Sequence, residues 1–108
     1  MTISYLTIID RLLVRGRAVI RESYRYYKVY LPTEYNDIWE HLHRERRVDV
    51  VVFLSEPINY VDKVLAVNRR LIKESDRFNL YLPKRYSDIW EKLCEEGKRV
   101  DLLVILKH

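Results

Sequence analysis

The chain has 108 residues, the size of one ordinary domain, and its hydrophobic content of 48% is enough to build a core. A charged content of 33%, with no apolar run near the roughly 20 residues that span a bilayer, excludes a membrane protein and a disordered chain. The net charge of +4 permits a polyanionic partner, and the single cysteine, Cys94, has no internal partner for a disulfide. The first residues lack the features of a signal peptide, so we expect a cytoplasmic protein with no membrane partner.

One phrase of the sequence occurs twice. YLPTEYNDIWEHL at 30–42 returns as YLPKRYSDIWEKL at 81–93, with nine of thirteen positions identical. The similarity extends outward to two further pairs of segments, which are 8–23 with 60–75 and 48–54 with 100–106. A repeat of about fifty residues is marginal for a core of its own. We therefore predict a single domain, 1–108, made of two repeats (1–55 and 56–108) that share one core with pseudo-two-fold symmetry.

Each repeat is predicted to open with a helix. Pairs of apolar residues in 8–13 and 60–65 follow a helical spacing, and Ser55-Glu56-Pro57 has the character of a helix start. The β-branched content leaves a strand open as the alternative for 5–14 and 57–67. Gly16 and Asn68 occupy the same repeat position, and both residue types tolerate a left-handed backbone, as at a helix end or tight turn.

Two short strands follow in each repeat. The first is AVIRES or RLIKES, and the second is YYKVYLP or FNLYLP, ended by proline. Alternation in the second strand places Tyr27, Val29 and Leu31 on one face, with Phe78, Leu80 and Leu82 as their equivalents. The other face carries Tyr26, Lys28 and Tyr30, with Arg77, Asn79 and Tyr81 as their equivalents.

The repeated phrase then predicts a helix. Tyr35, Ile38, Trp39 and Leu42 fall on one apolar stripe, which Tyr86, Ile89, Trp90 and Leu93 repeat. Asn36 or Ser87 is a candidate cap, with Thr33 or the residue before it as the alternative. The last segments, 48–54 and 100–106, are apolar on both faces, as central strands are. The fold class is therefore α+β, with tandem (α)ββαβ units.

The order of these elements resembles the AbrB/SpoVT/MazE-like swapped-hairpin proteins. The resemblance is carried by VYLPTEYNDIW followed by VDVVVF, and by LYLPKRYSDIW followed by VDLLVI. It implies a DNA-binding transcription factor or antitoxin, usually a dimer of intertwined hairpins, whose basic residues around the hairpin contact DNA. Two units in one chain would here replace that dimer. The glycine that precedes the last strand's aspartate in that group is missing, and the helix is longer.

Basic residues cluster around the predicted hairpins. They are Arg15, Arg17, Arg21, Arg25, Lys28, Arg69, Arg70, Lys73 and Arg77. Arginine and lysine contact phosphates, and an arginine reads guanine edges, so we expect nucleic acid as the partner, with double-stranded DNA first. The resemblance puts Arg15, Arg17, Arg69 and Arg70 at the head of this set. The alternative is a solvated strand face paired with Glu22, Glu74 and Asp76.

Three tyrosines on the same strands have two readings. Tyr26, Tyr30 and Tyr81 could stack on bases of a single strand, but tyrosine more often covers a half-buried β surface, which we favour. The tryptophans are read as core residues.

We expect no enzyme, no metal and no cofactor. The repeated acids have symmetric folding roles, although a Mg²⁺-dependent nuclease is the enzymatic alternative. His41, His43 and Cys94 lack zinc-ligand spacing, and no nucleotide-binding motif is present. The function predicted first is therefore a small transcriptional regulator. The alternative is a protein-interaction module, such as an accessory or inhibitory protein of a virus or mobile element. A homodimer and a thermophilic, archaeal or viral source fit either function.

Overall fold

The computed structural model describes residues 10–45 and 47–106 and contains two four-stranded antiparallel sheets. Sheet A has the order β1 (Arg11–Ala18), β8 (Arg99–Leu106), β4 (Val48–Ile58), β5 (Val61–Arg69). Sheet B has the order β2 (Ile20–Ser23), β3 (Tyr26–Tyr30), β7 (Arg77–Tyr81), β6 (Ile72–Glu74). The helices are α2 (Asn36–Glu45) and α3 (Ser87–Glu95), preceded by the 3-10 turns η1 (Thr33–Tyr35) and η2 (Lys84–Tyr86). The predicted α+β class is confirmed.

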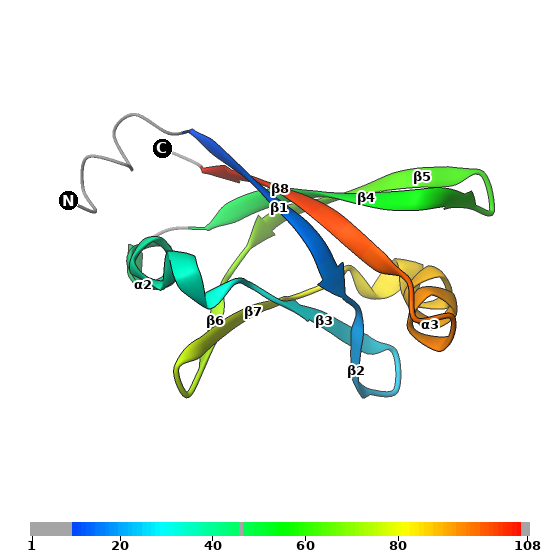
Figure 1. The fold of residues 1–108 in the computed structure, drawn as a ribbon, viewed down its shortest axis with the longest axis horizontal. Helices are drawn as coiled ribbons and strands as arrows, with labels where there is room; N and C mark the ends of the chain where they lie inside the picture. Colours follow the sequence, from blue (N-terminus) through cyan, green and yellow to red (C-terminus); the bar gives the residue numbers. More distant parts are fainter. Residues whose placement is uncertain (1–9, 46, 107–108) are drawn as a thin grey trace.

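The two sheets form two layers, and the helices lie at opposite sides between them (Figure 1). Strands from different repeats are neighbours, since β1 pairs with β8, β5 pairs with β4, and β3 pairs with β7 at the centre of sheet B. Each repeat therefore supplies only half of each sheet. One cluster of buried residues fills the space between the layers.

The repeated helix stripe is confirmed as core. Trp39 and Trp90 are both fully buried, and Ile38 and Leu42 with their equivalents are buried beside them. Each indole nitrogen donates a hydrogen bond to the carbonyl oxygen of the proline that ends the preceding strand, at 2.9 Å for Trp39 and 2.8 Å for Trp90. This bond satisfies a buried donor and fixes the angle between strand and helix. Asn36 and Ser87, the candidate caps, are instead the first residues of α2 and α3. The N-cap of α3 is Tyr86 and that of η1 is Pro32, the residue before Thr33, and neither makes a side-chain cap bond.

The alternation predicted for the second strand of each repeat is also observed. Tyr27, Val29 and Leu31 are buried on the inner face of sheet B. On the outer face, however, Lys28 and Asn79 are buried as well, at 4% and 1% exposed. Sheet B therefore has a buried polar centre on its outer side.

Of the two alternatives for the start of each repeat, the helix is wrong and the strand is confirmed where the structure describes these segments. Arg11–Ala18 and Val61–Arg69 are edge strands of sheet A, and Ser55-Glu56-Pro57 lies inside β4. Ile8 and Ile9 lie outside the described residues. The two-residue turn between β4 and β5 has left-handed backbone at both residues, Asn59 and Tyr60, which suits a tight hairpin. The apolar pairs misled the prediction because these strands carry apolar residues on both faces, and such a pattern resembles one helix stripe.

The segments predicted as central strands, β4 and β8, are the central strands of sheet A. Their inner residues are buried, but those of the outer face, such as Val51 and Leu103, are only half-buried. Sheet A is therefore covered on one side only among the described residues.

Candidate nucleic-acid interface

Each edge strand of sheet A has a β-bulge near its C-terminal end. Gly16 in β1 and Asn68 in β5 have φ values of 64° and 58°, so the left-handed backbone predicted at this repeat position is confirmed. The residues lie where the strand register shifts, not at a helix end. Such a bulge bends the edge strand, and after it the chain turns from sheet A into sheet B.

The two bulges are held by the same pair of contacts. The Gly16 N–H donates to Asp101 Oδ1 at 2.8 Å, and the Asn68 N–H donates to Asp49 Oδ1 at 2.7 Å. A guanidinium returns to the bulge carbonyl, from Arg99 to Gly16 at 2.8 Å and from Arg47 to Asn68 at 3.2 Å. Every contact joins one repeat to the other. The aspartates of the repeated Val-Asp strands therefore have a structural role.

Arginines gather around both bulges. We call Arg15, Gly16, Arg17 and Arg99 the Gly16 corner, and Arg47, Asn68, Arg69 and Arg70 the Asn68 corner. Arg17 and Arg69 are partly buried. The other arginines of the two corners are exposed, namely Arg15, Arg99, Arg47 and Arg70. Each corner has three arginines and one aspartate that accepts the bulge N–H, and at the Gly16 corner the same aspartate, Asp101, also lies 3.8 Å from Arg15 Nε. Both corners are therefore positively charged.

Arg17 links the Gly16 corner to sheet B. Its Nε donates to the Tyr30 carbonyl oxygen at 2.8 Å. Burial, and then the neighbouring charges of Arg99 and Arg77, lower the pKa of Arg17, while Glu34 opposes them. A guanidinium stays charged in spite of such a shift, so three like charges are concentrated here. An anion near this cluster would reduce their mutual repulsion.

The predicted residue Lys28 has a different place. Its ammonium lies 3.1 Å from Glu22 Oε2 and 3.4 Å from Glu74 Oε2. Burial disfavours the charge, but hydrogen bonds to Tyr30 and Glu22 outweigh it and raise the pKa of Lys28. Tyr30 also donates to Glu74 at 2.6 Å. This buried, compensated ammonium has no exposed surface to offer to a phosphate.

The other predicted residues are dispersed. Lys73 is paired with Glu40 at 2.5 Å, beside α2. Arg21 and Arg25 line a shallow pocket of about 170 Å³ that also includes Asp88 and Glu91 of α3. The Arg77 guanidinium lies 3.6 Å from the centre of the Tyr30 ring. The nine predicted residues therefore do not form one stripe. Arg15, Arg17, Arg69 and Arg70 lie at the corners, and Arg77 lies beside Arg17 next to the Gly16 corner.

Arg47 and Arg99 are not among the residues predicted for this site. Both stand directly before the repeated Val-Asp pair, so their shared repeat position was a usable signal. Each also follows a predicted helix, where basic residues are common, and this position obscured the signal.

The corners lie at diagonally opposite points of sheet A. Arg17 and Leu54 both pair with Val100 of β8, so Arg17 is level with Leu54 of β4. Arg69 pairs with Val48 of β4, which is six residues before Leu54. With a rise of about 3.3 Å per residue and a strand spacing of about 4.8 Å, the corners are roughly 25 Å apart. That distance is shorter than one turn of B-DNA, about 34 Å.

In 10–45 and 47–106, no group of three or more His, Cys, Asp or Glu side chains is arranged to hold a metal ion. Of the helices in these ranges, none has the length and apolar character needed to cross a membrane. Comparisons of this chain with protein-family models, curated proteins and solved structures gave no match.

Proposed function

We propose that this protein binds nucleic acid, with double-stranded DNA as the target, and acts as a small transcriptional regulator. The observation that carries the proposal is the pair of arginine corners, each with three guanidinium groups and a single, already occupied aspartate. Arginine at exposed, partly desolvated positions binds phosphate oxygens well. A separation of roughly 25 Å lets both corners contact phosphates within one turn of a duplex.

We also propose that the two repeats are related by a pseudo-two-fold axis. Exchanging equivalent strands leaves the order of each sheet unchanged, and the contacts at the two bulges are reciprocal. A dyad between the corners would present two equivalent contacts to a duplex, as a dimer of single units would. This arrangement supports the implied likeness to swapped-hairpin DNA-binding proteins.

The test is the salt dependence of binding to a fluorescently labelled random duplex. The variant Arg15→Ala/Arg70→Ala removes one exposed guanidinium from each corner. We expect weaker binding and a log–log salt slope reduced by about 1.8, since each lost phosphate contact is worth about 0.9. The matched control, Arg44→Ala/Arg85→Ala, removes the same charge from exposed positions that belong to neither corner.

Two results would overturn the proposal. One is the absence of duplex binding by the wild-type protein at low salt. The other is an equal loss in the corner variant and the control, because net charge alone would then account for binding.

The outer face of sheet A favours a second candidate function, a protein-interaction module that pairs with a second copy of this chain. Leu13, Leu103, Val51 and Leu65 form one register row across all four strands. Leu13 and Leu65 are 52% and 57% exposed at its two ends. The row reads Leu-Leu-Val-Leu, with leucine at both ends, which suits the self-complementary contact of a two-fold dimer.

The dimer expected from this face is weak. Four strands and about seven residues along them give roughly 450 Å² per copy. A stable interface buries about 800 Å² per partner. Sedimentation velocity over a range of concentrations tests this, with Leu65→Glu expected to abolish any dimer. A dimer unaffected by Leu65→Glu, or a monomer at all concentrations, would refute pairing through this face.

A further inference from the structure

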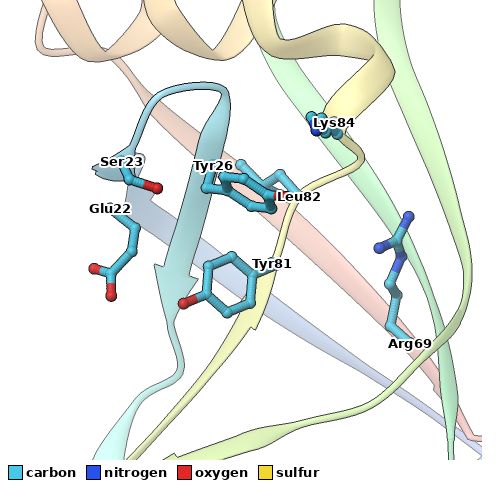
Figure 2. A pocket seen from close by; sticks show the side chains of 7 residues that line it. All are labelled: Glu22, Ser23, Tyr26, Arg69, Tyr81, Leu82 and Lys84. Carbon is cyan, nitrogen blue, oxygen red and sulfur yellow. The ribbon is translucent and has the colours of Figure 1, made fainter.

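A pocket of about 470 Å³ opens beside the Asn68 corner. Figure 2 shows Tyr26 and Tyr81 on neighbouring strands of sheet B, with Lys84 and Arg69 across the opening from them. Glu22, Ser23 and Leu82 complete the lining. The volume lies in the range of small-molecule sites, roughly 300 to 1,000 Å³.

The equivalent place in the other repeat is filled by the protein itself. There, Arg17 donates to the Tyr30 carbonyl oxygen at 2.8 Å, and the Arg77 guanidinium covers the Tyr30 ring at 3.6 Å. Tyr26 stands at the repeat position of Arg77, and its ring meets the Tyr81 ring edge-on, with centroids 6.4 Å apart. Arg77 therefore covers Tyr30 in one repeat, whereas in the other repeat Tyr26 takes the place of that arginine and forms an aromatic pair with Tyr81.

Arg69, the equivalent of Arg17, lacks the bond that Arg17 makes. Its Nε is buried and has no hydrogen-bond partner among the described residues. A buried donor left without a partner is costly, so an acceptor that reached it would be bound favourably. An anionic oxygen is the strongest such acceptor.

The charge of the pocket favours an anion. Lys84 adds a second cation, with its Nζ 4.9 Å from the centre of the Tyr26 ring. Among the described residues that line the pocket, Glu22 is the one acid, and Lys28 already holds it at 3.1 Å. Two cations therefore face an aromatic pair with one compensated carboxylate.

We propose that this pocket binds a nucleoside phosphate, with the base against the Tyr26–Tyr81 pair and the phosphate between Arg69 and Lys84. A stacked base and a charge-assisted phosphate contact together use every unusual feature of the pocket. The nucleotide comes either from solution or from an unpaired position in a nucleic acid, and for the second source the inference rests on the proposed function. The Gly16 corner, closed by Arg77, binds only backbone phosphates.

Isothermal titration with a 5′-mononucleotide, its nucleoside and inorganic phosphate tests the pocket directly. We expect the mononucleotide to bind more tightly than either fragment. Tyr26→Ala should weaken it about fivefold or more, the usual effect of losing a stacking partner, and Lys84→Gln should weaken it by a similar factor. The matched controls are Tyr24→Ala and Arg85→Gln, which change the same residue type or charge at exposed positions outside the pocket.

Duplexes with and without a single-stranded overhang separate the two sources. If nucleic acid supplies the nucleotide, an overhang should raise affinity over a blunt duplex in a manner that Tyr26→Ala abolishes. If free nucleotide is the ligand, the overhang should have no effect while mononucleotide binding remains.

The pocket and the proposed function fail in different ways. Salt-dependent binding of blunt duplex, with no Tyr26-dependent binding of mononucleotide or overhang, would overturn the pocket and leave the corners standing. Mononucleotide binding that depends on Tyr26, without duplex binding at low salt, would support the pocket and overturn duplex recognition. Circular dichroism and thermal melting of Tyr26→Ala and Lys84→Gln would detect a folding defect, which is not expected because both side chains are exposed.

Discussion

The left-handed bulge at Gly16 gives the sharpest prediction about stability. A Cβ added to Gly16 would meet no atom within 4 Å, so space does not limit substitution. The cost of Gly16→Ala is then the left-handed backbone itself, about 1–2 kcal/mol for an L-residue. Reduced freedom of the unfolded chain offsets about 0.4–1 kcal/mol of this. We expect a net loss of about 1 kcal/mol.

Gly16→Asn should cost less than half of that amount. Asparagine occupies the equivalent bulge at Asn68, with φ of 58°, and it tolerates this conformation better than alanine does. Gly97→Ala is the matched control, because Gly97 has φ of 65° and equally open surroundings but no contact with the Asp–Arg pairs of the bulges. Its loss should equal that of Gly16→Ala.

Urea unfolding followed by tryptophan fluorescence measures all three variants. A loss of about 1 kcal/mol corresponds to a fall of roughly 4–8 °C in Tm for a domain near this size. An unchanged or increased stability of Gly16→Ala would refute the argument. So would a Gly16→Asn variant as unstable as Gly16→Ala, since the two bulges would then not share one backbone requirement.

Three further changes test other parts of the molecule. Trp90→Phe removes the donor to the Pro83 carbonyl oxygen and opens a small void. We expect the free energy of unfolding, measured in urea, to fall by about 2–3 kcal/mol. Asp101→Ala removes the acceptor of the Gly16 N–H. We expect the free energy of unfolding to fall by about 1–2 kcal/mol, and the Gly16 amide hydrogen to exchange faster with solvent. The hydrogen bond from Tyr30, and then that from Lys28, lower the pKa of Glu74 below its usual value although burial opposes them. This stabilisation is therefore present above pH about 4.5 and lost as pH falls through the lowered pKa, so the pH profile of Tm should be flatter below pH 4.5 in Glu74→Gln.

The elements that sequence predicted well are those with a simple burial pattern. Ile38, Trp39 and Leu42 form one helix stripe because one face of α2 is buried, and the alternation around Val29 reflects a strand with one apolar face. The edge strands were mistaken for helices because Leu13 and Leu65 are apolar but face outward. Whether such a segment forms a helix or a strand is decided by its pairing with distant strands, which the local sequence pattern does not record.

The candidate interface was predictable in composition but not in position. Arg15 and Arg17 are two positions apart, as residues on one face of a regular strand are, but the bulge at Gly16 interrupts the alternation between them. Lys28 looked exposed because its strand alternates, yet carboxylates from β2 and β6 neutralise it. Contacts between the two repeats, which join residues as far apart as Gly16 and Asp101, are not readable from local spacing.

The pairing of β8 between β1 and β4 has a consequence for how the chain is made. Among the strands that the structure describes, β1 is synthesised before its neighbour in sheet A, β8, which follows more than eighty residues later. Until then the edges of β1 and β4 are both open, and an open edge accepts any complementary strand. We therefore expect that a delay in the synthesis of β8 favours pairing with the β8 of another molecule, and so strand exchange between chains.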